Sequence, residues 1–397
     1  MKVLFIDGVG VFGGACRSLY ENLKFLRKKE IEFFFIIQNG TIKDYYRKFS
    51  NNIITSIGLT RFDNTEYSYY RGLRWLVLLR EIFYLPFTII AMIRAKLSWG
   101  KIDIIHVNEI TEILSLLIAK LFFRKSKVIV HCRSIYRKDK SSYRNKLISF
   151  VINNFVDILI AIDSNVKSSL PKFHKTFVIN NSFSIEENNE ENNEKNIDLT
   201  DILQIGYVGT ISEMKGIYDL IEALKIVKKK SRKFKLKVAG SQIHNNRFYL
   251  SSILQKLSIQ KGNKKEINNI ISDYNLKSDI IFLGHIKEIS GFYKSIDVLC
   301  FPSRLNAPGR PIIEASYFKK PSIACISEVF DDTFINQKTG IAVKPANPEE
   351  LANAIIYLID NKNKLKKMGD YAYANYKKYN NPEINSNKIY NLYKTLI

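Results

Sequence analysis

Lys215 follows an apolar strand at a place where it could neutralise a phosphate. It stands in Gly209-Thr-Ile-Ser-Glu-Met-Lys215-Gly216, between a strand expected over Leu203–Val208 and a helix expected over Gly216–Lys229. Open α/β sheets bind ligands at the carboxyl ends of their strands, and a helix start adds a partial positive charge. The spacing is not that of a Walker loop, because no Ser or Thr follows the lysine. The position suits a diphosphate; the alternative is a solvated lysine in a first turn.

A second loop, Phe301–Ala315, also follows an apolar strand and carries polar groups that could hold a nucleotide. Pro308-Gly309 ends the loop and Arg310-Pro311 opens a helix, which places Glu314 one turn inside that helix. A carboxylate there can accept hydrogen bonds from both hydroxyls of a ribose. The alternative for Glu314 is a helix-surface acid that compensates the dipole.

A glycine-rich loop follows the first strand and contains GxGxxG at Gly8, Gly10 and Gly13, with Gly14 next. The dinucleotide fingerprint also requires an acid at the end of the second strand, but that strand ends Ile37-Gln38-Asn39. The sequence therefore disfavours NAD binding. Gly13 and Gly14 still allow a close backbone approach to a phosphate at a helix N-terminus, and the alternative is a tight turn without a ligand.

Two histidines end apolar strands. His131 opens the polar stretch His131-Cys-Arg-Ser134 at the carboxyl end of its strand, which favours a functional role. His106 is equally consistent with a buried structural histidine. No GxSxG motif is present, and the five histidines are too scattered to indicate a metal site.

The elements that must position these residues alternate between strand and helix, a pattern that predicts parallel sheets covered by helices. The rhythm breaks at the Asn- and Glu-rich stretch after Ser184 and then restarts. We therefore predict an α/β chain with two doubly wound domains facing each other across a cleft. The predicted parts are residues 1–183, a polar linker over 184–200, a second domain over 201–380, and a C-terminal segment over 381–397. The strands are expected at 2–6, 32–38, 103–107, 127–133, 158–162 and 176–179, then at 203–208, 234–239, 280–283, 298–301 and 322–324.

Composition sets further limits. The 397 residues are 46% hydrophobic with a net charge of +23, which excludes a disordered chain and indicates anionic partners. Residues 1–185 hold 29 basic and 14 acidic residues, so the first half carries most of the positive charge. Four dispersed cysteines and the lack of a signal peptide favour the cytoplasm. The apolar segment around Trp75–Ile93 is interrupted by charges, so we expect it to lie on an anionic membrane rather than cross it.

Together these features resemble the retaining GT-B glycosyltransferases of family 4, also grouped as glycosyl transferases group 1. The resemblance covers nearly the whole chain. It rests on the order and spacing of short motifs: Gly13-Gly14 followed by Arg17-Ser-Leu19, Asp103-Ile-Ile-His106, Val130-His131, Asp157 to Ser164, Val178 to Asn181, Val208-Gly209 to Lys215-Gly216, Phe282-Leu-Gly284, and Pro302-Ser303 to Glu314-Ala315.

The resemblance implies two Rossmann-like domains, with the acceptor bound mainly by the first, the nucleotide sugar by the second, and a last helix near Pro382–Thr395 that returns to the first. It assigns catalytic roles to His131, near the anomeric carbon, and to Lys215, on the diphosphate. It assigns donor binding to Gly13, Gly14, Thr210, Lys215, Asn306, Gly309, Arg310 and Glu314.

Two positions depart from the family pattern. Thr210 stands where many members have an arginine, and Asn306 stands where the first acid of a glutamate pair is expected. An amide cannot stabilise a positive charge as a carboxylate does. We consider Arg304 or Arg310 as a substitute for the missing cation.

The expected function is therefore retaining transfer of a sugar from a nucleotide-diphosphate donor, UDP- or GDP-linked, to a glycan or lipid-linked acceptor in surface polysaccharide assembly. Neither a metal nor another cofactor is expected, because Lys215 and helix N-termini supply the positive charge. The expected location is the cytoplasm, with peripheral attachment to the inner face of the membrane. The alternatives are a sugar-nucleotide epimerase of the same fold and a binding protein without catalysis. Nucleic-acid binding rests on charge alone, since no reader motif is present.

Overall fold

The structure is a computed structural model that describes every residue except 138, 140–141, 186–201, 241–263 and 287. It contains two compact units, one made of Met1–Ser182 with Asn381–Ile397 and one made of Phe183–Asn380. All but the first two residues of the predicted linker, 184–200, lie outside the described residues.

Unit 1 contains a parallel sheet of seven strands in the order β3-β2-β1-β4-β5-β6-β7. Its central strands are buried on both faces and are therefore almost continuously apolar, as in Val3–Ile6, where every side chain is fully buried. The strands are β1 (Lys2–Asp7), β2 (Glu32–Gln38), β3 (Ile53–Ser56), β4 (Ile104–Val107), β5 (Lys127–Cys132), β6 (Ile158–Ala161) and β7 (Thr176–Val178).

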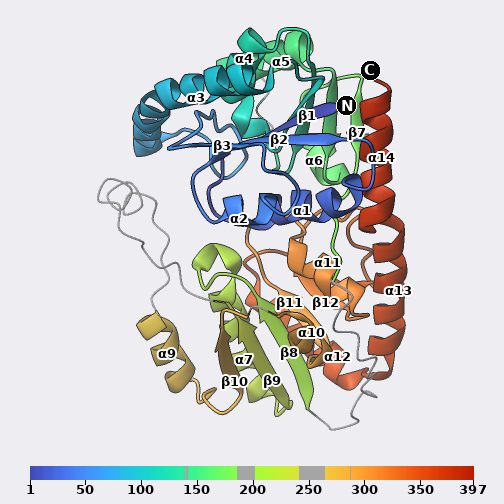
Figure 1. Cartoon of the computed structure of the whole chain (residues 1–397). Coiled ribbons are helices and arrows are strands. Elements are labelled where there is room, and N and C mark those ends of the chain that lie inside the picture. The colour runs from blue at the N-terminus through green and yellow to red at the C-terminus, as the bar shows by residue number, and fades with distance from the viewer. Residues whose placement is uncertain (138, 140–141, 186–201, 241–263, 287) are drawn as a thin grey trace. The chain divides into compact units, whose positions relative to one another are not determined.

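Helices cover both faces of this sheet (Figure 1). The inward face of α1 shows why it forms, since Cys16, Leu19, Leu23 and Leu26 follow the helical period and are fully buried. The core on that side also receives α2 and the last helix, α14, while α3, α4 and α5 cover the other side. The helices are α1 (Gly14–Leu26), α2 (Ile42–Tyr46), η1 (Gly72–Leu76), α3 (Val77–Trp99), η2 (Ile110–Glu112), α4 (Ile113–Phe122), α5 (Tyr143–Phe155), α6 (Ser164–Ser169) and α14 (Pro382–Lys394).

Long-range hydrogen bonds attach α14 to the rest of unit 1. The Nδ2 of Asn385 donates to the carbonyl of Asn180 at 2.9 Å, and the hydroxyl of Ser386 donates to the carbonyl of Asn22 at 3.1 Å. The hydroxyl of Tyr393 lies 2.6 Å from Nδ1 of His106.

Unit 2 repeats the design with a parallel sheet of six strands in the order β10-β9-β8-β11-β12-β13. The strands are β8 (Leu203–Val208), β9 (Phe234–Ala239), β10 (Ile280–Gly284), β11 (Val298–Phe301), β12 (Ser322–Cys325) and β13 (Gly340–Val343). The helices are η4 (Glu213–Lys215), α7 (Ile217–Lys229), α9 (Lys264–Asp273), α10 (Ser290–Lys294), α11 (Arg310–Tyr317), α12 (Pro348–Asp360) and α13 (Asn363–Tyr379).

The strand orders confirm the predicted α/β fold class and locate the switch point of each sheet. Chain order reverses between β1 and β4 in unit 1 and between β8 and β11 in unit 2. Doubly wound sheets bind ligands at the carboxyl ends of the strands beside this point. The loops that follow β8 and β11 are the ones that carry Lys215 and lead to Glu314. The edge strands β3 and β13 were not expected from the sequence.

Candidate functional site

The loop after β8 ends at Gly216, whose backbone fixes the position of Lys215. Gly216 has a φ of 72° in the left-handed region, and a Cβ added there would lie 1.7 Å from the carbonyl oxygen of Pro302. Only glycine fits such a contact without a backbone shift. The η4 turn is therefore pressed directly against the loop after β11.

The ammonium group of Lys215 has no anionic partner among the described residues. Lys215 is half-buried, and within the described part of the chain no hydrogen bond or ion pair involves its ammonium group. Burial lowers the pKa of Lys215 from its ordinary value, because desolvation disfavours the charged form. An anion at the ammonium would reverse this cost, which makes the site suited to a phosphate.

Arg304 ties the two loops together. Its Nε and Nη2 bind the carboxylate of Asp219 at 2.7 and 2.6 Å, and its Nη1 binds Glu213 at 2.7 Å. Its backbone N–H donates to the carbonyl of Met214 at 3.1 Å. Because two carboxylates neutralise this guanidinium, the structure argues against the hypothesis that Arg304 replaces the missing diphosphate cation. Arg304 instead holds the turn that ends in Lys215.

Replacing Arg304 with glutamine is expected to weaken UDP binding about tenfold and to destabilise unit 2 by about 1–3 kcal/mol, discounted for partial exposure of the pair. The reason is that Asp219, with 8% of its side chain exposed, would lose its counterion. Calorimetry and urea unfolding measure both effects. Adding Asp219→Asn should restore part of the stability; a double variant no more stable than Arg304→Gln would contradict this role.

Glu314 lies on α11 and has both carboxylate oxygens occupied. Its Oε1 accepts from Nε of Arg310 at 2.8 Å, and its Oε2 accepts from the hydroxyl of Tyr293 at 2.9 Å. Arg310 also stacks over the ring of Phe183. These contacts fix the carboxylate in one orientation. They also pair the charge of Arg310, the other residue considered as a substitute cation. Tyr293 was not identified from the sequence.

The remaining predicted residues of unit 2 line the same two loops. Gly309 is the N-cap of α11, and a Cβ there would lie 2.3 Å from the ring of Phe301, so packing requires this glycine. Asn306 has a φ of 47°, and its Oδ1 accepts from the backbone N–H of Ser327 at 2.6 Å. Asparagine tolerates the left-handed region better than most residues, which gives a physical reason for this departure from the family pattern. The carbonyl of Thr210 accepts from the hydroxyl of Tyr207 at 2.9 Å.

In unit 1, Gly13 and Gly14 begin α1 without a side-chain cap. A Cβ at Gly14 would meet nothing within 4 Å, so the helix N-terminus is open to a ligand. The first two glycines of the GxGxxG pattern have packing reasons instead. A Cβ would lie 2.2 Å from the carboxylate of Glu112 at Gly8 and 2.6 Å from the carbonyl oxygen of Asn39 at Gly10.

The two histidines lie in the interior of unit 1, with their ring centroids 5.6 Å apart. His131 is 1% exposed, its Nδ1 lies 3.3 Å from Nη2 of Arg133, and its Nε2 has no hydrogen-bond partner within the described chain. Burial, with Arg133 adding to it, lowers the pKa of His131 well below its ordinary value and that of His106 to about 3. Both rings are therefore neutral at pH 7. The role of His131 beside the anomeric carbon stays a prediction.

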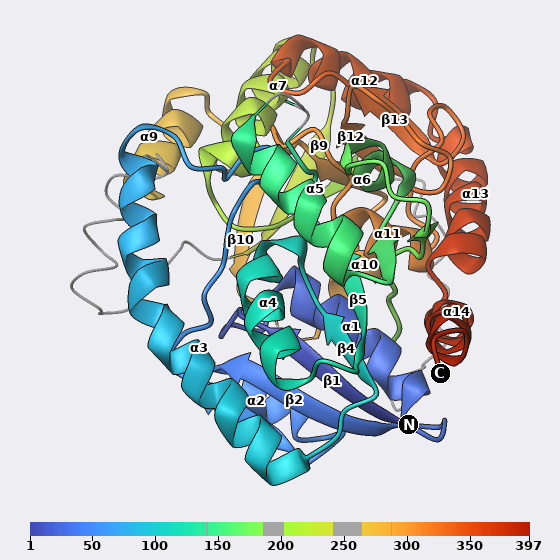
Figure 2. The same cartoon turned by 90° about the horizontal axis from the view of Figure 1, so that it is seen from above.

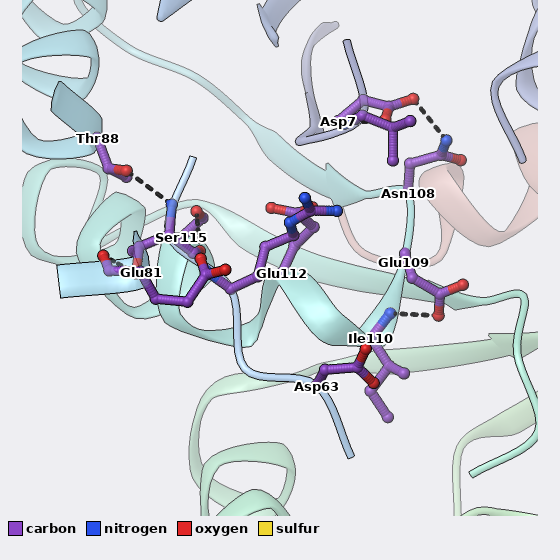
Figure 3. Close-up of polar contacts among 12 residues, drawn as sticks. Asp7, Asp63, Glu81, Thr88, Asn108, Glu109, Ile110, Glu112 and Ser115 are labelled. Carbon is purple, nitrogen blue, oxygen red and sulfur yellow. Dashed lines mark hydrogen bonds and ion pairs between the residues drawn. The ribbon is translucent and has the colours of Figure 1, made fainter. Parts of the chain in front are cut away.

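A group of buried acids around the switch point of unit 1 was missed by the sequence reasoning (Figure 3). Asp7 accepts from Nδ2 of Asn108 at 2.7 Å, and Glu109 accepts from the hydroxyl of Ser134 at 2.9 Å. Glu112 lies under Gly8, 3.8 Å from Nε of Arg61, and its Oε2 has no hydrogen-bond partner among the described residues. The one available signal was the position of Asp7 and Glu109 at the ends of β1 and β4.

Glu112→Gln is expected to flatten the pH dependence of stability. Burial raises the pKa of Glu112 to about 8, opposed by Arg61. The folded chain therefore holds this proton more tightly than the unfolded chain, and the resulting stability is complete at low pH and lost as pH rises through about 8. Urea unfolding at pH 5, 6, 7 and 8 measures the free energy of unfolding of both proteins. Relative to the wild type, that of the variant should rise by at most about 1.4 kcal/mol per pH unit. The histidines are common to both proteins, so their effect cancels, and parallel profiles would refute the assignment.

Comparison with known proteins finds a family that resembles the second half of the chain. Residues 188–375, just under half of the chain, match the family described as glycosyl transferases group 1. The second half of the chain is therefore similar to the group 1 glycosyltransferases. The capsular polysaccharide biosynthesis glycosyltransferase CapM of Staphylococcus aureus is 28% identical over 219 residues, which are 51% of this chain and 52% of CapM. The trehalose synthase of Pyrococcus furiosus is 24% identical over 172 residues, 42% of this chain and 38% of its own length. The chain thus spans about half or less of the length of these two relatives.

Solved structures extend the similarity to the whole chain at the level of the fold. HepE of Anabaena, crystallised with UDP-glucose, superposes with a TM-score of 0.72 at 20% identity and covers 100% of both chains. A glycosyltransferase of Rickettsia africae gives 0.70 at 19% identity, over 100% of this chain and 98% of its own. The chain therefore has the GT-B fold. In the described part of the chain no group of three or more His, Cys, Asp or Glu residues could hold a metal ion.

Proposed function

We propose that the chain transfers a sugar from a nucleotide-diphosphate donor to an acceptor. The observation that carries this proposal is the unpaired ammonium of Lys215 at the switch point of unit 2, beside the loop that leads to Glu314. In the reaction, the anomeric carbon exchanges its bond to the diphosphate for a bond to the acceptor oxygen, and the diphosphate leaves with the electron pair. Lys215 and the positive end of the α11 dipole would stabilise the leaving charge without a metal ion.

The donor nucleotide, the acceptor, the stereochemistry and the location are proposed on separate grounds. We propose UDP as the nucleotide of the donor, because HepE was crystallised with UDP-glucose. A glycan or lipid-linked acceptor in surface polysaccharide assembly is supported by the name of CapM. We propose retention of configuration from the resemblance to family 4, and a cytoplasmic location from four cysteines that are buried free thiols.

A thermal-shift screen against UDP, GDP, ADP and their sugars tests the proposal. We expect one nucleotide class to raise the melting temperature and its sugar to be turned over in excess EDTA. Hydrolysis of the donor without an acceptor would separate an enzyme from a protein that only binds. No shift with any nucleotide would refute the donor assignment, and loss of turnover in EDTA would refute metal independence.

We also propose peripheral membrane attachment, through the outer surface of η1, α3, α4 and α5, which we call the apolar face. Fifteen of the twenty-five exposed large apolar side chains in the described residues lie on these four helices. Figures 1 and 2 show α3, α4 and α5 along one side of unit 1, and α4 contacts both of its neighbours. A patch of this kind marks a protein or membrane contact.

Charge selects a membrane with anionic lipids. Residues 71–101 hold six basic side chains and one acid, Glu81, which is 3% exposed. Each basic residue near an anionic surface contributes about 1 kcal/mol. Basic groups beside exposed Leu, Ile and Phe are typical of a helix that lies in the membrane interface.

The sequence predicts that this apolar segment lies on a membrane rather than crosses it. Among the described residues one helical segment, Gly72–Trp99, is 28 residues long and apolar enough to span, with 22% of its most apolar window buried. Its inner side, however, belongs to the core, since Thr88, Met92 and Ala95 are fully buried. We therefore retain the interfacial assignment.

Phe83→Glu is expected to weaken binding to vesicles containing phosphatidylglycerol at least tenfold, because Phe83 is 59% exposed on the apolar face and a charge there opposes insertion. Vesicle co-sedimentation measures the effect. Tyr371→Glu, at an exposed position of α13, is the matched control and should bind as the wild type. Equal binding to neutral phosphatidylcholine vesicles, unaffected by about 0.5 M salt, would exclude the electrostatic part of the proposal.

A further inference from the structure

A cavity of about 380 Å³ lies in unit 1, outside the loops discussed above. Arg137 follows β5, Ser149 lies on α5, and Lys172 follows α6; all three line the cavity. Two cations and a hydroxyl are thus placed around one hollow. Cationic and hydroxyl donors together are the groups that bind phosphate oxygens in proteins.

Arg137 is held rigidly but keeps one donor free. Its guanidinium lies 4.2 Å from the ring centroid of Tyr69, and its Nη2 binds Asp139 at 3.0 Å. Its Nη1 is buried and has no hydrogen-bond partner among the described residues. Nη1 itself is closed off from solvent, so a ligand in the cavity would meet the charge of the guanidinium rather than this donor. A single carboxylate, Asp139, does not balance both Arg137 and the exposed Lys172.

Neutral donors complete the lining. Tyr136 is 2% exposed, and within the described chain its hydroxyl completes no hydrogen bond that meets ordinary geometry. Burial raises the pKa of Tyr136 to about 12, although the neighbouring Asn64 lowers this pKa by a smaller amount. The hydroxyl therefore stays protonated. No hydrogen bond of the Ser149 hydroxyl is present among the described residues. Because the Tyr136 hydroxyl is itself closed off from solvent, Ser149 and Lys172 are the lining residues whose donors have no partner among the described residues and could meet an oxyanion.

A chain of side-chain contacts links Arg137 to the apolar face. The Tyr69 ring, which lies against the guanidinium of Arg137, also lies 5.5 Å from the guanidinium of Arg144. Arg144 in turn lies 5.3 Å from the ring of Trp75. Trp75 is 46% exposed on η1 and stacks on Tyr70. A ligand bound here would meet cations at one end and exposed aromatic surface at the other.

From this juxtaposition we infer that the cavity binds the phosphate of an amphiphile. The phosphate would contact Arg137, Lys172 and Ser149, and the apolar chain would extend over Trp75. The phosphate has two sources: the diphosphate of a lipid-linked acceptor, which rests on the proposed function, or the headgroup of a membrane lipid, which does not.

The test is a binding titration with farnesyl diphosphate and with inorganic pyrophosphate, followed calorimetrically on the full chain. We expect farnesyl diphosphate to bind at least tenfold more tightly than pyrophosphate, because only the former also covers apolar surface. Arg137→Gln should weaken farnesyl diphosphate binding at least tenfold and Lys172→Gln several-fold, since each removes one charge-assisted contact. Lys167→Gln, an equal change of charge at an exposed site on α6, is the matched control and should have no effect.

The two sources are separated with phosphatidylglycerol vesicles. Loss of vesicle binding in Lys172→Gln assigns the headgroup; unchanged vesicle binding with weakened farnesyl diphosphate binding assigns the acceptor diphosphate. Ser149→Phe, which fills the cavity from a half-buried position, keeps the test valid if Arg137→Gln does not fold. Wild-type affinity for both probes in Lys172→Gln and Ser149→Phe would overturn the inference. UDP binding in unit 2 should not change in any of these variants, so failure here is distinct from failure of the proposed function.

Discussion

Lys215→Ala is expected to lower sugar transfer roughly 100- to 1,000-fold, the range measured when one preorganised donor to a developing charge is removed. The ammonium carries no compensating carboxylate in the described structure, so its whole interaction is available to the ligand. The same variant should lose most of the UDP-dependent rise in melting temperature. Steady-state kinetics with saturating acceptor and a thermal-shift titration with UDP measure the two effects.

Two further variants serve as controls for Lys215→Ala. Lys229→Ala removes an exposed lysine at the end of α7 and should leave both readouts unchanged. Lys215→Arg keeps the charge but changes its geometry, and we expect partial activity. If Lys215→Ala folds and transfers sugar at the wild-type rate, the diphosphate is not held by this residue.

Glu314→Gln is expected to weaken UDP binding about 10- to 150-fold, which corresponds to the 1.5–3 kcal/mol of a hydrogen bond to a charged group. The amide keeps the shape of the side chain but loses the charge that accepts from a ribose hydroxyl. It also leaves Arg310 without its partner, which is 2.8 Å away in the wild type. Isothermal titration with UDP and with free UMP measures the loss, which should be similar for both because both contain the ribose.

The controls separate binding from structure. Glu349→Gln changes an exposed acid in the first turn of α12 and should not alter UDP affinity. Tyr293→Phe removes the hydrogen bond to Oε2 of Glu314 but leaves the carboxylate, and we expect a loss of only a few-fold. A larger effect from Tyr293→Phe than from Glu314→Gln would show that the cluster is structural and does not read the ribose.

Most central strands could be predicted because they are buried on both faces and therefore appear as nearly continuous apolar runs, as in Val3–Ile6 and Val298–Phe301. Two of the four edge strands, β3 and β13, could not be predicted. Ile53–Ser56 and Gly340–Val343 have only four residues each, and one contains two polar residues while the other begins with glycine. Short segments of this kind gain their strand conformation from pairing with β2 and β12 rather than from their own pattern.

The positions of Lys215 and Glu314 at a ligand-binding edge could be predicted because each follows a recognisable strand. Their partners could not, because the contacts are distant in sequence. Arg304 reaches Asp219 across 85 residues, and this ion pair reverses the role that the sequence suggested for it. The same holds for Glu112. Its carboxylate lies so close to Gly8 that a Cβ at this position would collide with it, and packing therefore requires the glycine.

The most direct test of the account is a crystal structure of the chain with UDP. The account predicts the Nζ of Lys215 within about 2.7–3.2 Å of a diphosphate oxygen. It also predicts that Glu314 accepts a hydrogen bond from a ribose hydroxyl. A diphosphate bound elsewhere in unit 2, with the ammonium of Lys215 still without an anion beside it, would contradict the central claim.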